Sequence, residues 1–184
     1  KFIAPEMSVL NLFSYTGAYS LFSLKCGSKD VHSVDLSPRY MKWLEKNIEL
    51  NPMLKSSYHK SVVSPANDAL LTYKASQKSF DLIICDPPSS SSDGNRRSKA
   101  IHSYHQLLPS MLDVLKEKGK IVLFLNTHNI TFKKFFSEIE SQFKLHPKSK
   151  THKIQKFKAD HWDCPSKKGF PEGDYLKAIL ISPL

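Results

Sequence analysis

The chain has 184 residues, of which 40% are hydrophobic and 24% charged, and a formal net charge of +10. This length suffices for one domain with a buried core that needs neither disulfides nor a structural metal, and no apolar run approaches the roughly 20 residues of a membrane-spanning helix. The three cysteines, Cys26, Cys85 and Cys164, form no C-x-x-C pair, which argues against a zinc site or a disulfide framework. We therefore expect a single cytoplasmic domain over residues 1–184, with no metal and no membrane segment.

The excess of basic over acidic residues favours a polyanionic partner. Lysine and arginine together number 27 against 17 aspartates and glutamates, and the excess is densest between Lys144 and Lys168. A basic protein of this size often binds nucleic acid. A solvated basic surface without a partner has the same composition, so charge alone favours nucleic acid only modestly.

Short apolar runs alternate with helical patterns along the chain. Strands are predicted at Val9–Phe13, Val31–Asp35, Tyr58–Val63, Phe80–Cys85, Lys120–Leu125 and Tyr175–Ser182. Helices are predicted at Ala18–Lys25, Pro38–Leu50, Pro65–Lys74, Ala100–Lys116 (closed by Lys118-Gly119) and Phe132–Phe143. The alternation predicts an α/β fold with a mainly parallel sheet and helices on both faces. The last strand follows a loop rather than a helix, which predicts an antiparallel strand pair at one edge.

The first turn of this pattern is poor in glycine. Ser14-Tyr15-Thr16-Gly17 follows the first strand, and Asp35 closes the second. A carboxylate there can accept both hydroxyls of an adenosine ribose, although Asp35 taken alone could be a solvent-facing residue. Binding of a pyrophosphate would need the G-x-G-x-x-G loop that is missing here. The pattern therefore favours a ligand with adenosine but no phosphates, of which S-adenosylmethionine is the common one.

Polar residues also follow the later strands. Asp68, near the third strand, could accept a hydrogen bond from an adenine amino group or cap the next helix. Asp86-Pro87-Pro88 directly follows the fourth strand, and because proline has no N–H, it makes a rigid rim rich in carbonyl acceptors that can hold a base against a methyl donor. The candidate catalytic residues are Asp86, Pro87, Pro88 and Asn126, the last of which follows the fifth strand. The candidate cofactor-binding residues are Ser14, Tyr15, Thr16, Gly17, Asp35, Leu36, Asn67, Asp68 and Asp86.

Four segments resemble the class I S-adenosylmethionine-dependent methyltransferases that modify large-subunit (23S) ribosomal RNA: "VLNLFSYTG", "VDLSPRYMKWLEKNIELN", "FDLIICDPPS" and "GFPEGDYLKAILI". The similarity runs from Val9 to Leu180 in the expected order. It implies a Rossmann-like fold with a mainly parallel seven-stranded sheet, and that the chain is the C-terminal catalytic part of a longer protein. By the same resemblance, Tyr15, Thr16 and Gly17 line the cofactor loop, Asp35 binds the ribose, Asp68 lies on the adenine side and Asp86 faces the methyl group.

Residue types that the chain lacks limit which atom of the base can receive the methyl group. Methylation at carbon 5 of a pyrimidine requires a thiolate that first adds to the ring, and relatives with that chemistry carry a cysteine after the fifth strand, where this chain has Leu125-Asn126-Thr127-His128. Methylation of an exocyclic amine usually uses (N/D)-P-P followed by an aromatic residue that holds the base, and Ser89 and Ser90 do not supply one. A guanine N7 needs little beyond alignment with the donor. Because Asn126 matches relatives that methylate this atom, guanine N7 in RNA is favoured.

Other interpretations stay open. Cys164 leaves cytosine C5 methylation as an alternative, and the fold also serves acceptors other than RNA. A nicotinamide-dependent oxidoreductase would share the first strand–helix–strand unit but predicts a G-x-G-x-x-G. A non-catalytic RNA-binding module would explain the charge but not the acids at successive strand ends. Arg96 and Arg97, at the far end of the loop after Pro88, are the candidate RNA-binding residues.

Overall fold

A computed structural model describes residues 3–88, 99–127, 130–157 and 176–184. The strands of its seven-stranded sheet are β1 (Ser8–Leu12), β2 (Asp30–Asp35), β3 (His59–Val63), β4 (Phe80–Cys85), β5 (Leu115–Asn126), β6 (His152–Lys156) and β7 (Leu176–Pro183). The helices are α1 (Ala18–Lys25), α2 (Pro38–Glu49), α3 (Ala66–Ala75), α4 (Lys99–Asp113) and α5 (Phe132–Leu145), with short 3₁₀ turns at Ser56–Tyr58 and Pro147–Lys150. None of the helices in these ranges is long and apolar enough to span a membrane.

The strands lie in the order β3-β2-β1-β4-β5-β7-β6. The first five strands of the chain are parallel, whereas β7 is inserted between β5 and β6 and runs antiparallel to both. The predicted Rossmann-like architecture and the antiparallel C-terminal pair are thus confirmed. Because the chain moves outward from β1 to β3 and then returns to β4 on the other side of β1, the switch in strand order falls between β1 and β4. A ligand site is expected outside the carboxyl ends of these two strands.

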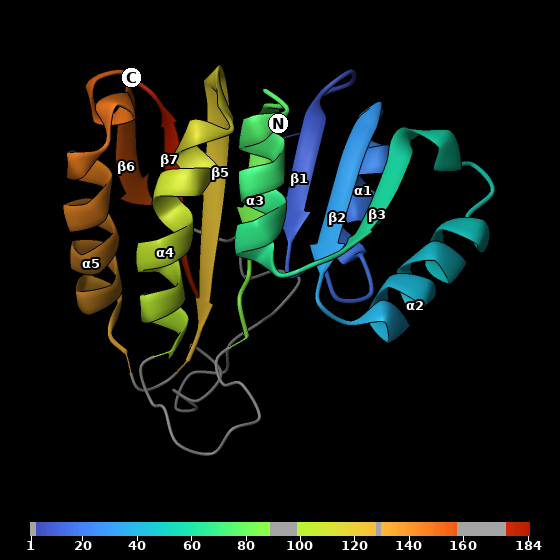
Figure 1. Ribbon diagram of the computed structural model, residues 1–184, viewed down its shortest axis with the longest axis horizontal. Coiled ribbons are helices and arrows are strands. Elements are labelled where there is room, and N and C mark those ends of the chain that lie inside the picture. The colour runs from blue at the N-terminus through green and yellow to red at the C-terminus, as the bar shows by residue number, and fades with distance from the viewer. Residues whose placement is uncertain (1–2, 89–98, 128–129, 158–175) are drawn as a thin grey trace, which may run out of the picture.

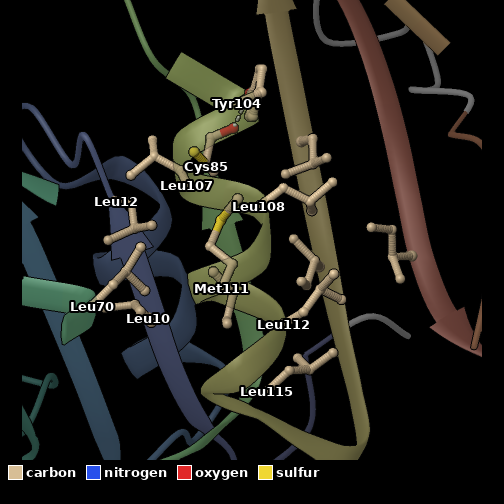
Figure 2. Packing of buried hydrophobic residues seen from close by; sticks show 14 of the residues in the cluster. Leu10, Leu12, Leu70, Cys85, Tyr104, Leu107, Leu108, Met111, Leu112 and Leu115 are labelled. Carbon is tan, nitrogen blue, oxygen red and sulfur yellow. Dashed lines mark hydrogen bonds between the residues drawn. The ribbon is translucent and has the colours of Figure 1, made fainter. Parts of the chain in front are cut away.

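Two helical layers enclose the sheet and bury one hydrophobic core on each face. Helices α3, α4 and α5 lie in front of the sheet in Figure 1, and α1 lies behind it. The α3–α5 side buries Leu10 and Leu12 of β1, together with the α4 residues Leu108 and Met111 (Figure 2). The other side buries Val9 of β1 against residues of α1 and α2. Alternate residues of β1 therefore face opposite cores, as the pleat of a strand requires.

One boundary in the sequence-based prediction is wrong. The helix predicted at Ala100–Lys116 ends at Asp113, and β5 already begins at Leu115. The carbonyl of Val114 accepts a hydrogen bond from the Phe80 N–H at 2.9 Å, and Leu115 then pairs with Phe80 of β4. The register shifts before Lys120, so the Gly119 region is an irregularity inside a strand rather than the end of a helix. The other predicted elements agree with the structure to within two residues at each end, but β6 was not predicted as a strand.

Candidate active site

A cavity of about 460 Å³ opens at the carboxyl edge of the sheet, at the switch point. Its volume falls within the roughly 300–1,000 Å³ typical of small-molecule sites. The lining residues come from the segments after β1, β2, β3 and β4 and from α2: Phe13, Tyr15, Val34, Asp35, Leu36, Tyr40, Ser64, Pro65, Ala66, Asp86 and Pro88. Of the predicted site residues, the fold therefore brings Tyr15, Asp35, Leu36, Asp86 and Pro88 together around one space.

The turn after β1 has an unusual backbone. Phe13 and Tyr15 have φ angles of 57° and 48°, and Gly17 has a φ of 89°. A left-handed conformation at a non-glycine residue costs of the order of 1–3 kcal/mol, and such residues cluster at functional sites. Hydrogen bonds fix the turn: the Ser14 N–H donates to the Val34 carbonyl at 3.0 Å, and the Asn47 side-chain amide donates to the Thr16 carbonyl at 3.0 Å.

Gly17 explains why the turn keeps one glycine. A Cβ atom at this position would lie 2.4 Å from Cγ of Leu44, a fully buried residue of α2. This glycine therefore serves close packing between the start of α1 and α2. Like Ser14 and Thr16, it does not line the cavity, so of the four predicted loop residues only Tyr15 does.

Asp35 connects the segments that follow β1 and β2 through hydrogen bonds. Its carboxylate accepts hydrogen bonds from the backbone N–H groups of Tyr15 and Ser37, each at 2.9 Å. The sequence suggested only a ribose contact, but this carboxylate also orders the turn after β1. Each carboxylate oxygen has a second lone pair that can accept a further hydrogen bond. Asp35 can therefore fix the turn and bind a hydroxyl group of a ligand at the same time.

Apolar side chains form the neighbouring lip of the cavity. Leu36 is 69% exposed and Tyr15 54% exposed, and the Tyr15 ring lies edge-on to that of Tyr40, with centroids 4.5 Å apart. Exposure of large apolar side chains around a concave site suits a flat, partly apolar ligand such as a purine base. Phe13, Val34 and Tyr40 were missed, because the sequence-based prediction started from the polar residues at the strand ends.

The segment after β3 contributes other residues than expected. Asn67 and Asp68 are exposed in the first turn of α3 and do not line the cavity, whereas Ser64, Pro65 and Ala66 do. Pro65, not Asp68, is the N-cap residue of α3. The available signal was the position of Ser64, which directly follows the predicted third strand.

Asp86 has an environment opposite to that of Asp35. It is half-buried, and burial raises the pKa of its carboxyl group. None of the described residues donates a hydrogen bond or forms an ion pair with it. Pro87 is buried and Pro88 is exposed on the cavity, so the two prolines anchor the segment and form its rim. Asn126 is exposed at the end of β5, the strand next to β4, but does not line the cavity.

The described cysteines are poorly placed for nucleophilic attack. Cys85 is fully buried at the end of β4, and burial raises the pKa of its thiol. Cys26 is the C-cap residue of α1. Cys164 lies outside the described residues, as do Arg96 and Arg97, and within the described ranges no group of three His, Cys, Asp or Glu side chains could hold a metal ion.

The strand order, the antiparallel end of the sheet and the cavity at the switch point define the class I methyltransferase fold. The chain belongs to the family described as "Conserved hypothetical protein 95", whose sequence model matches residues 2–143. The resemblance to large-subunit ribosomal RNA methyltransferases is confirmed at the family level by curated relatives.

Two relatives and one solved structure illustrate this similarity. A Bacillus subtilis protein, suggested by its name to be a ribosomal RNA large subunit methyltransferase, is 32% identical over 97% of this chain and 44% of its own length. A ribosomal RNA large subunit methyltransferase of Deinococcus radiodurans is 30% identical over 94% of this chain and 41% of its own length. A solved structure of a protein that is only suggested by name to be a methyltransferase, in complex with SAH, has a TM-score of 0.80 and 29% identity, covering 97% of this chain and 46% of its own. The chain thus spans less than half the length of these relatives.

Proposed function

We propose that this chain transfers a methyl group from S-adenosylmethionine to a base of RNA, with large-subunit ribosomal RNA as the substrate class and guanine N7 as the target atom. The observation that carries the proposal is the cavity at the switch point, which has the hydrogen-bonded Asp35 on one side and the Asp86-Pro87-Pro88 rim on the other. The turn after β1, which lines this cavity through Phe13 and Tyr15, has no glycine-rich cradle for a pyrophosphate.

The lining residues fit the parts of the proposed cofactor. Leu36, Pro65 and Ala66 offer apolar surface for the adenine, and the Asp35 carboxylate can accept hydrogen bonds from the ribose hydroxyls. Of the remaining candidates, Ser14, Thr16 and Gly17 would influence cofactor binding through the shape of the turn after β1. Asn67 and Asp68 would contact the cofactor from the first turn of α3, outside the cavity lining. When bound, the cofactor supplies a methyl group activated by a sulfonium.

Asp86 and its neighbours would hold the acceptor base. A carboxylate whose pKa is raised by burial accepts hydrogen bonds strongly from N–H donors, because little water competes for it. Pro87 and Pro88 cannot donate hydrogen bonds, so their carbonyl groups stay available to amino groups of a base. Asn126, at the end of the adjacent strand, could contact the same base from the other side. These groups would orient the acceptor nitrogen, which needs no covalent activation.

Three observations support RNA and a nitrogen acceptor. The formal charge of +10 suits a polyanionic substrate, and the two curated relatives are named for ribosomal RNA. Carbon 5 methylation would need an accessible thiolate, and the thiol of Cys85, next to Asp86, is fully buried. Arg96 and Arg97, which follow Pro88 by eight and nine residues in the sequence, would contact the RNA backbone.

Nucleoside analysis tests the target atom. Unmodified ribosomal RNA is incubated with the chain and methyl-labelled S-adenosylmethionine, and the digested RNA is separated by chromatography. We expect label in 7-methylguanosine, both with the natural chain and with a variant in which Cys26, Cys85 and Cys164 are changed to alanine. Label in 5-methylcytidine that disappears on Cys164→Ser would overturn the nitrogen assignment.

A further inference from the structure

A buried tyrosine lies directly behind the candidate catalytic rim. Tyr104 of α4 is fully buried, and its hydroxyl lies 3.0 Å from the carbonyl oxygen of Cys85, to which it donates a hydrogen bond (Figure 2). The same hydroxyl is also hydrogen-bonded to the carbonyl of Phe124. These carbonyls belong to the last residue of β4 and to the third-last residue of β5.

The two carbonyl groups mark the point where β4 and β5 separate. The parallel pairing between these strands ends at Cys85 and Leu123, whereas β5 continues to Asn126 by pairing with β7 alone. Asp86 comes one residue after the Cys85 carbonyl, and Asn126 comes two residues after Phe124. The Tyr104 hydroxyl therefore bridges the strands at the fork from which these two candidate residues leave the sheet.

The surroundings of Tyr104 hold this bridge in place. The Tyr104 ring packs against that of Phe135 in α5, with centroids 5.6 Å apart. Burial raises the pKa of the Tyr104 hydroxyl well above its ordinary value, so it keeps its proton and remains a donor. Because the hydroxyl has a single proton, this proton is shared between the two carbonyl oxygens of Cys85 and Phe124.

We infer that Tyr104 is a positioning residue, which sets the separation between Asp86 and Asn126 by bridging the carbonyls of Cys85 and Phe124. The inference rests on the proposed function of Asp86 and Asn126 in holding the base. Tyr104 touches neither the cavity nor the reacting atoms, so its effect should fall on turnover and spare cofactor binding.

Tyr104→Phe tests this inference, with Tyr73→Phe as the matched control. Tyr73 is a buried tyrosine of α3 whose hydroxyl is hydrogen-bonded to Nδ1 of His32 at 2.9 Å, in the body of the sheet. For Tyr104→Phe we expect kcat to fall about tenfold or more, with the Kd of S-adenosylhomocysteine changed by less than about twofold. Tyr73→Phe should lower the melting temperature without lowering kcat.

A second readout does not depend on activity. In ¹⁵N-labelled protein, the amide resonances of Asp86 and Asn126 should shift or broaden in Tyr104→Phe and stay in place in Tyr73→Phe. Replacing Tyr104 by 4-aminophenylalanine restores a hydrogen-bond donor, so it should recover both turnover and the two resonances. This rescue variant also distinguishes loss of the bridge from misfolding.

Several results would overturn the inference. It fails if Tyr104→Phe keeps the natural kcat, if turnover is lost while the Asp86 and Asn126 resonances stay unchanged, or if the donor-restoring variant does not recover them. If the natural chain binds cofactor but methylates no RNA, the proposed function fails, and the amide resonances alone decide whether Tyr104 sets this separation.

Discussion

Two aspartates on one cavity have opposite environments. Asp35 accepts two backbone hydrogen bonds, whereas Asp86 accepts none from the described residues and has a pKa raised by burial. A carboxylate held by amides is suited to a fixed contact, such as that with a ribose. A half-buried carboxylate without a donor is suited to a ligand that brings its own N–H groups. The sequence already suggested the ribose for Asp35 and the methyl-transfer side for Asp86, and the different neighbours of the two carboxylates are consistent with these two roles.

Asp35→Ala should weaken cofactor binding. Loss of a charged acceptor for the ribose costs about 1.5–3 kcal/mol, or roughly 10- to 150-fold in Kd. Titration calorimetry with S-adenosylhomocysteine measures this change. Asp113→Ala is the control, because Asp113 is also held by two partners, Lys74 and His146, but does not line the cavity. Equal affinities of Asp35→Ala and Asp113→Ala would remove Asp35 from the site.

Asp86→Asn should stabilise the protein at neutral pH. The stability linked to a raised carboxyl pKa is present below the ordinary value of 3.8 and is lost as the pH rises through the folded-state value. Above that range the natural chain carries the cost of a buried charge, which asparagine avoids. The melting temperature of Asp86→Asn should therefore exceed that of the natural chain at pH 7, and the difference should shrink as the pH falls towards 4.

Asp81→Asn supplies the control with the opposite sign. Burial alone would raise the pKa of Asp81, but hydrogen bonds from Lys116 and Ser8 lower it overall. This variant should melt below the natural chain at pH 7, with a difference that shrinks in acid. A lower melting temperature for Asp86→Asn at pH 7 would contradict the assigned environment of Asp86.

At the scale of elements, the turn between β1 and α1 both lines the cavity and allows α1 to pack closely against α2. Phe13 and Tyr15 take left-handed conformations on the cavity side, and Gly17 takes one where α1 approaches α2. The strain is offset by the hydrogen bonds from Ser14 and Asn47 and by the Asp35 carboxylate. The turn is thus fixed by contacts with β2 and α2, which lie later in the sequence.

Gly17→Ala should destabilise the protein by roughly 2–4 kcal/mol, the sum of backbone strain and a clash with a packed core residue. Gly27→Ala separates the two terms: Gly27 has a φ of 92°, but a Cβ there would meet Pro5 at an ordinary 3.4 Å. That variant should lose only about 1 kcal/mol. Urea unfolding measures both free energies, and equal losses would show that the contact with Leu44 is unimportant.

Helices and strands were predicted correctly where residues close in the sequence determine them. The apolar run of Phe80–Cys85 and the Ser37-Pro38 start of α2 are examples, and the Ser37 side chain does accept a hydrogen bond from the Tyr40 N–H. The start of β5 could not be predicted, because Leu115 pairs with Phe80, 35 positions earlier. The lining by Ser64 and Ala66 was missed although the helix was predicted to begin at Pro65, because the carboxylate of Asp68 was preferred as the binding group; in the structure Asp68 is exposed in the first turn of α3 and does not line the cavity.

At the scale of the whole molecule, basic charge should steer RNA to the cavity edge. Changing Arg96 and Arg97 to glutamine should reduce the slope of log K against log salt concentration by about 1.4 for single-stranded RNA, since each lost phosphate contact removes about 0.7. The control changes Lys148 and Lys150, which follow α5 and so lie at the opposite edge of the sheet. It removes the same charge and should leave the slope nearly unchanged. Equal slopes in both double variants would make the effect one of net charge alone.

The most direct test of the account is transfer of a labelled methyl group from S-adenosylmethionine to unmodified large-subunit ribosomal RNA, measured in parallel for the natural chain and Asp86→Ala. Because Asp86 is proposed to orient the acceptor base rather than to hold the adenosine, Asp86→Ala should bind cofactor with nearly natural affinity. The account predicts label in the RNA with the natural chain and a rate at least about 100-fold lower with Asp86→Ala. An Asp86→Ala variant that transfers at the natural rate, or a natural chain that binds both cofactor and RNA but transfers no label, would contradict it.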